Sequence, residues 1–196
     1  RLYLGDIGGV KLLTAPQEVE LARDIEAAGY VLELETKLEA VPAQADAARR
    51  IVTRMLERLC DGGRTIDSLC RYLGLQGPWT LSRIMVHPEV RDGLDGAARE
   101  GMVDFMSDNL GLEAEEVKQQ VREISLSSRL LPGEVLEVMG EGIAIDELRI
   151  RLGEPGLADE LGSYERLWHA RWSRIKERGD DAKNHMAEAN LRLVVS

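Results

Sequence analysis

Histidine, cysteine and carboxylate side chains are the groups that could catalyse a reaction or hold a metal. The chain has three histidines, His87, His169 and His185, which lie far apart, and none stands in a metal-ligand motif with a cysteine or a carboxylate. The sequence contains no phosphate-binding glycine loop and no nucleophile elbow. We therefore expect no enzyme, no metal site and no cofactor.

Residues 103–123 have the spacing of a helix-turn-helix, because Leu110-Gly111-Leu112 resembles its turn. A recognition helix needs side chains that read bases or bind phosphate. The second helix instead begins with Glu113, Glu115 and Glu116, which would set carboxylates against phosphates. We interpret this segment as structural.

The two ends of the chain carry the most specific motifs. Residues 1–8 read RLYLGDIG, residues 12–14 read LLT and residues 18–23 read EVELAR, while residues 187–196 read AEANLRLVVS. The first set resembles region 1.2 of bacterial primary sigma factors, and the last resembles the start of region 2.1 of the same family. The chain starts without methionine and stops inside an apolar run, so we expect it to be a segment of a longer protein.

The resemblance implies contacts with the non-template strand of a melted promoter. Tyr3 and Leu4 match positions that meet a base of the discriminator, and Arg1 matches a position near the backbone of that DNA strand. Gly5 departs from the family, whose members often have a larger residue there, which puts one discriminator contact in doubt. The pocket for the flipped last thymine of the −10 element is matched by three residues: Glu18, Asn190 and Leu193. Asparagine offers a donor and an acceptor to a base edge, and tyrosine stacks on bases.

The middle of the chain, residues 31–181, resembles in position and length the non-conserved insert of the family. We therefore divide the chain into a region 1.2-like part at 1–30, an acidic helical insert at 31–181, and the start of a region 2.1-like helix at 182–196 that packs against 1–30. The formal net charge of the chain is −10, and nearly all of the excess acid lies in the insert. An acidic body repels phosphate, so we expect the chain alone to bind DNA weakly.

Glycine and proline divide the chain into segments with helical spacing of apolar residues. Thr14 and Gln17 form a capping-box pattern that predicts the start of a helix reaching towards Pro42. Further helices are predicted at 43–60, 65–73, 81–86, 89–109, 113–124, 133–139, 143–152 and 159–178, and the last is expected to break at Gly179, with a new helix from Asp180.

Composition supports the same fold class. Hydrophobic residues make up 44% of the chain, but aromatic residues only 4%, so the core depends on aliphatic side chains, which suits helices. We expect an all-α protein, an irregular helical bundle with a helical insert lobe. Cys60 and Cys70 are too few for a disulfide framework, and no signal peptide or membrane-spanning run is seen, which favours a cytoplasmic protein without membrane contact.

The implied partners are the RNA polymerase core, through its largest subunit, and promoter DNA, both in the full-length protein. The segment alone is expected to bind both weakly. In the family, the main helix that binds the polymerase core and the aromatic residues that recognise the −10 element follow region 2.1. The acidic insert fits a basic polymerase surface or serves as a soluble spacer. The alternative function is a helical protein–protein adaptor, or a regulator that mimics sigma and touches no DNA.

Overall fold

The computed structural model describes residues 13–39, 46–97 and 99–195. The described residues form helices joined by turns and loops, and their only strand-like feature is an isolated bridge between Thr80 and Ala144. The predicted all-α class is confirmed for this part of the chain. The described residues divide into two compact units, one made by those up to Ala47 together with those from Arg166 onward, the other by Ala48–Glu165.

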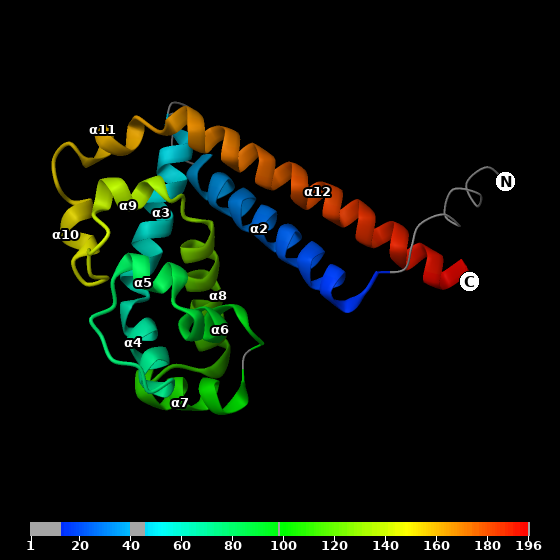
Figure 1. The fold of residues 1–196 in the computed structure, drawn as a ribbon, viewed down its shortest axis with the longest axis horizontal. Coiled ribbons are helices and arrows are strands. Elements are labelled where there is room, and N and C mark those ends of the chain that lie inside the picture. The colour runs from blue at the N-terminus through cyan, green and yellow to red at the C-terminus, as the bar shows by residue number, and fades with distance from the viewer. Residues whose placement is uncertain (1–12, 40–45, 98, 196) are drawn as a thin grey trace. The chain divides into compact units, whose positions relative to one another are not determined.

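The first unit is a hairpin of two long antiparallel helices, α2 (Ala15–Glu39) and α12 (Glu165–Val195) (Figure 1). The start of α2 shows one half of the predicted capping box: the backbone N–H of Thr14 donates to the side-chain oxygen of Gln17, at 2.9 Å. A free N–H group at the start of the helix is satisfied in this way. The Thr14 hydroxyl donates to the same oxygen, at 3.0 Å, so it does not act as the acceptor that the full box requires.

Small residues let the two helices of the hairpin approach each other closely. A Cβ atom added at Gly179 would lie 2.2 Å from Cβ of Ala28 and 3.1 Å from the carbonyl oxygen of Asp24. Ala28 and Ala182 are buried in this contact between α2 and α12, which we call the seam. Ion pairs flank it: Lys176 Nζ lies 2.8 Å from a Glu35 oxygen, and Arg178 lies 2.8 Å from Asp24.

The predicted helix break at Gly179 is wrong. Helix α12 passes through Gly179 without interruption, and this glycine is buried. Glycine costs a helix interior about 1 kcal/mol relative to alanine, which is the reason for expecting a break. Here the missing side chain is what allows contact with α2, so tertiary packing overrides the local preference. The helix predicted at 159–178 is instead interrupted earlier, between α11 (Leu157–Gly162) and α12.

The second unit is a lobe of shorter helices. Its longest helix, α8 (Ala114–Leu130), contacts four of the other helices (Figure 1): α4 (Gly63–Tyr72), α5 (Leu81–Val86), α6 (Pro88–Asp95) and α7 (Glu100–Leu110). Besides α11, its helices are α3 (Ala47–Asp61), α4 (Gly63–Tyr72), α5 (Leu81–Val86), α6 (Pro88–Asp95), α7 (Glu100–Leu110), α8 (Ala114–Leu130), α9 (Glu134–Met139) and α10 (Leu148–Leu152). The single helix predicted at 89–109 is two helices, because α6 ends at Asp95 and Gly96 takes up an extended conformation.

The start and the end of the lobe are joined by one carboxylate. The oxygens of Glu165 accept hydrogen bonds from the backbone N–H groups of Ala48, at 2.8 Å, and Arg49, at 2.7 Å. A carboxylate is favourable at a helix N-terminus, since it satisfies free amides and complements the dipole of α3. The chain therefore enters and leaves the lobe at neighbouring points, although the two points are more than a hundred residues apart.

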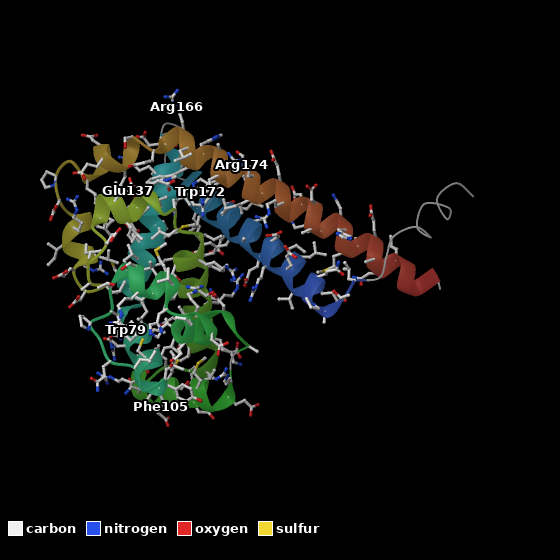
Figure 2. The ribbon with its side chains drawn as sticks, viewed as in Figure 1. Trp79, Phe105, Glu137, Arg166, Trp172 and Arg174 are labelled. Atoms are coloured by element: carbon white, nitrogen blue, oxygen red, sulfur yellow. The ribbon has the colours of Figure 1, made fainter. Side chains whose placement is uncertain are left out.

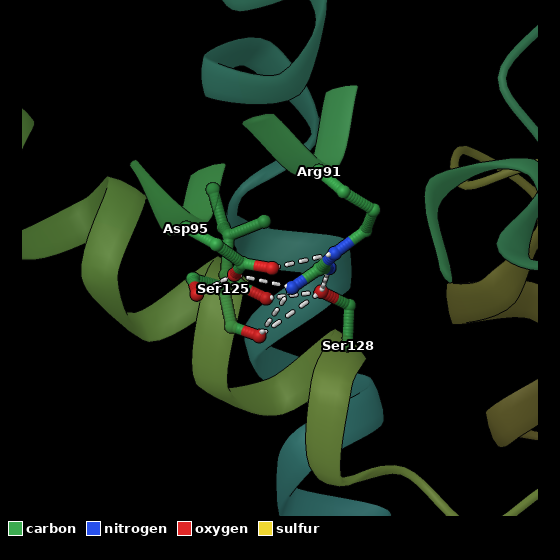
Figure 3. Close-up of polar contacts among 5 residues, drawn as sticks. Arg91, Asp95, Ser125 and Ser128 are labelled. Atoms are coloured by element: carbon green, nitrogen blue, oxygen red, sulfur yellow. Dashed lines mark hydrogen bonds and ion pairs between the residues drawn. The ribbon is translucent and has the colours of Figure 1, made fainter. Parts of the chain in front are cut away.

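A polar cluster fastens α6 to α8 (Figure 3). Asp95 accepts hydrogen bonds from the Arg91 guanidinium, through Nε at 3.0 Å and through Nη2, and from the Ser125 hydroxyl. Nη1 of Arg91 donates to Ser128 Oγ at 2.6 Å. The Arg91 and Asp95 side chains are only 15% and 18% exposed, so losing either partner leaves a charge in a poorly solvated place.

Replacing Asp95 with alanine is expected to lower the free energy of unfolding by about 2–3 kcal/mol, because Arg91 and Ser125 lose their acceptor. Asp92 on the same helix provides the control. Its ion pair with Arg99 is 67% and 64% exposed, and Asp92→Ala should cost less than about 1 kcal/mol. Urea unfolding followed by circular dichroism measures both, and equal losses would contradict the structural role of the cluster.

Both cysteines are protonated thiols in the fold. Burial raises the pKa of Cys60, and burial with the nearby Asp67 carboxylate raises the pKa of Cys70 to about 12. At pH 8 the Cys70 thiol of the folded chain should react with iodoacetamide about a thousandfold more slowly than in the urea-unfolded chain, since the thiolate fraction falls tenfold per pKa unit. Because the fold favours the neutral thiol, its contribution to stability is complete below pH 9 and is lost as the pH rises above that value. Mass spectrometry of the modified peptide measures the rate, and equal rates in both states would contradict this assignment.

Candidate nucleic-acid interface

Two of the residues that the sequence assigns to a base pocket, Glu18 and Asn190, lie near one end of the hairpin, where α2 begins and α12 ends. Gly179 lies opposite Ala28, and both helices rise about 1.5 Å per residue in opposite directions. Ten residues further along α12 and ten residues back along α2, Ala189 comes level with Glu18. Glu18 and Asn190 therefore lie at nearly the same position along the hairpin axis, at the end formed by the start of α2 and the end of α12.

Glu18 lies in the first turn of α2 with an exposed side chain. Its backbone N–H donates to the Thr14 carbonyl oxygen at 3.0 Å. Its carboxylate takes no part in the capping hydrogen bond, which joins Thr14 and Gln17. Within the described residues the carboxylate makes no ion pair. A carboxylate in the first turn also stabilises a helix through its dipole, so Glu18 has a structural role in addition to any contact with a base.

Asn190 is exposed on α12, and its neighbour Ala189 is buried in the seam. Its side-chain amide makes no hydrogen bond to the part of the chain that the structure describes. The amide can therefore offer one acceptor and two donors to a base edge. A buried neighbour holds the backbone of this turn in place, so the amide projects from a fixed helix.

The remaining predicted site residues fall outside what the structure describes. Arg1, Tyr3 and Leu4 lie in the undescribed segment 1–12. Leu193 lies within the backbone of α12, and its side chain is outside the described part. The contacts that the sequence assigns to these four residues stay predictions.

Two apolar side chains near this end of the hairpin were missed by the sequence reasoning. Val19 is 53% exposed and follows Glu18, and Leu191 is 51% exposed and follows Asn190. Each lies off the buried stripe of its helix, which is the signal that could have revealed it. Exposed aliphatic groups beside a carboxylate and an amide give a surface on which an unstacked base can lie.

Comparison with known protein families gives one match. Residues 1–30 match the family model described as Sigma-70 factor, region 1.2, and this match supports a sigma-70 family factor. The matched segment includes Glu18 and the first half of α2. Sigma-70 factors are non-catalytic transcription initiation factors that act with the RNA polymerase core. No curated protein and no solved structure matched the chain.

None of the described helices combines the length and the apolar character that crossing a bilayer requires.

Proposed function

We propose that this chain is part of a primary, housekeeping-type sigma factor that directs RNA polymerase to promoters. Residues 1–30 act as region 1.2, residues 31–181 as the non-conserved insert, and residues 182–196 as the start of region 2.1. The factor works in the cytoplasm, in complex with the polymerase core. The observation that carries the proposal is the antiparallel hairpin, because it sets a segment matching region 1.2 beside a helix whose end resembles region 2.1.

The proposed role of the hairpin end is to hold the melted non-template strand. Glu18, Asn190 and Leu193 line the pocket for the flipped last thymine of the −10 element. Tyr3 and Leu4 meet a discriminator base, and Arg1 neutralises the adjacent backbone. An amide reads a base edge, a leucine covers its apolar face, and a tyrosine stacks on its neighbour, so the combination suits single-stranded DNA.

The lobe has a proposed role separate from DNA. Its carboxylates outnumber its basic groups, so it contributes no attraction for phosphate and is better suited to a basic protein surface. We assign that surface to the largest subunit of the polymerase core. The two ends of the lobe, at Ala48 and Glu165, are hydrogen-bonded to each other, as expected of a lobe inserted into a longer chain.

Site-specific photocrosslinking in the full-length factor tests the proposal. A photoreactive amino acid at position 18 or 190 should crosslink to the non-template strand in complexes with polymerase core and promoter DNA. The same group at the exposed position Leu167, near the other end of α12, is the matched control and should give no such crosslink. Crosslinks to polymerase but none to DNA from positions 18 and 190 would favour the adaptor or sigma-mimicking regulator instead.

A further inference from the structure

A cavity of about 620 Å³ opens on the lobe beside α4. This volume lies within the range of sites that hold a small ligand or an inserted side chain. Its walls come from one face of α4, from the loop that follows α4, and from the segment just before α10. Its lining includes the apolar side chains of Ile66, Cys70, Trp79 and Ile145.

The floor of the cavity is apolar and firmly held. Ile66, Cys70, Trp79 and Ile145 are each at most 7% exposed. The Ile145 N–H donates to the Trp79 carbonyl oxygen at 3.0 Å, which ties two of these residues together across the isolated bridge. Arg83 lies over the Trp79 ring, 4.4 Å from its centroid (Trp79 is labelled in Figure 2). The floor is therefore preformed and needs little rearrangement to accept an apolar group.

The rim of the cavity carries charges of both signs. Arg64 and Arg71 lie on the same face of α4 as Asp67, and Asp146 faces them from the segment before α10. All four side chains are exposed, and none forms an ion pair within the described residues. Two cations and two anions that do not pair with each other favour an occupant that also carries both signs.

The loop along the cavity adds free backbone groups. Residues 75–78 lie outside the helices and the bridge, and although the Leu75 N–H donates to the Cys70 carbonyl oxygen, the N–H groups of Gln76 and Gly77 donate no hydrogen bond to the described part of the chain. Exposed backbone groups beside a pocket are what an extended peptide uses when it pairs along an edge and inserts one side chain. A small free molecule would leave these groups to water.

We propose that this cavity is a docking site for an extended segment of a partner protein, which inserts an apolar side chain flanked by an acidic and a basic residue. The apolar side chain fills the floor formed by Ile66, Cys70, Trp79 and Ile145. Its basic neighbour meets Asp67 or Asp146, and its acidic neighbour meets Arg64 or Arg71. The site lies in the lobe and does not depend on the promoter contacts of the hairpin.

Selection of a phage-displayed random peptide library on the immobilised 196-residue chain tests the proposal. Enriched peptides should carry an apolar residue between charges of opposite sign. Their affinity, measured by fluorescence anisotropy, should fall about fivefold or more for Arg71→Glu and for Asp67→Lys. The exposed Arg166 on α12 (labelled in Figure 2) supplies the control, and Arg166→Glu should leave the affinity unchanged.

Nuclear magnetic resonance locates the bound peptide, because the indole N–H signal of Trp79 should shift on titration. Circular dichroism confirms that the exposed charge variants remain folded. The proposal is overturned if no peptide is enriched, if the enriched peptides bind Arg71→Glu and Asp67→Lys as tightly as the unsubstituted chain, or if the Trp79 signal stays in place. Displacement of the peptides by free leucine at comparable affinity would assign the cavity to a small molecule and would also overturn it.

Discussion

Replacing Gly179 with leucine is expected to lower the free energy of unfolding of the chain by about 3 kcal/mol. A Cβ atom at this position would lie 2.2 Å from Cβ of Ala28, and the neighbouring backbone oxygen of Asp24 has no freedom to move away. The helices α2 and α12 must separate to admit the side chain, which weakens the packing of the whole seam. Urea unfolding followed by circular dichroism measures the loss.

Gly29 provides a matched control on the same hairpin. It is exposed, and a Cβ atom there would meet nothing within 4 Å. Gly29→Leu should therefore raise the free energy of unfolding by about 0.5–1 kcal/mol, since leucine is a better helix former than glycine. The two substitutions are chemically identical and are expected to have opposite signs. A stabilising Gly179→Leu would mean that the seam is not tightly packed.

A second effect is expected in promoter binding by the full-length factor. Glu18→Ala and Asn190→Ala should each weaken the complex of polymerase and promoter by about 1 kcal/mol, because each removes a polar contact to a base. If both side chains contact the same base, the double variant should lose less than the sum, with a coupling energy of at least about 0.5 kcal/mol. The helix-dipole effect of Glu18 cancels in such a cycle.

Glu177 is the control partner for this double-mutant cycle. It is exposed on α12 and lies roughly 20 Å along the helix from Asn190. Glu18→Ala and Glu177→Ala should therefore combine additively, within about 0.5 kcal/mol. Dissociation of promoter complexes gives the free energies. If the losses of binding free energy caused by Glu18→Ala and Asn190→Ala are additive, the two side chains do not contact the same base, even if each single change weakens the complex.

Local signals in the sequence predicted the local structure well. The capping pattern of Thr14 and Gln17 is visible within four residues, and its Gln17 half is present at the start of α2. The predicted helix at 81–86 has the observed bounds of α5, since Thr80 accepts a hydrogen bond at its start and His87 precedes Pro88 at its end. In both cases the information lies in neighbouring residues.

Tertiary contacts account for what the sequence did not predict. Gly179 was expected to end a helix because the sequence carries no sign that Ala28 lies against it. The cavity on the lobe was missed for a similar reason, since its floor unites Trp79 with Ile145 through a single bridge between distant segments. The register of α2 against α12, which brings Glu18 level with Asn190, also depends on contacts between the two ends of the chain.

The proposed base pocket requires Glu18 and Asn190 to lie side by side, and a spin-label distance measures this directly. In a chain carrying Cys60→Ser and Cys70→Ala, labels introduced through Glu18→Cys and Asn190→Cys should lie within about 20 Å of each other, given the usual spacing of packed helices. A second pair, Glu18→Cys with Ala170→Cys, should be separated by roughly 30 Å because of the rise along α12. Equal distances for the two pairs, or a longer one for the first, would contradict the shared base pocket.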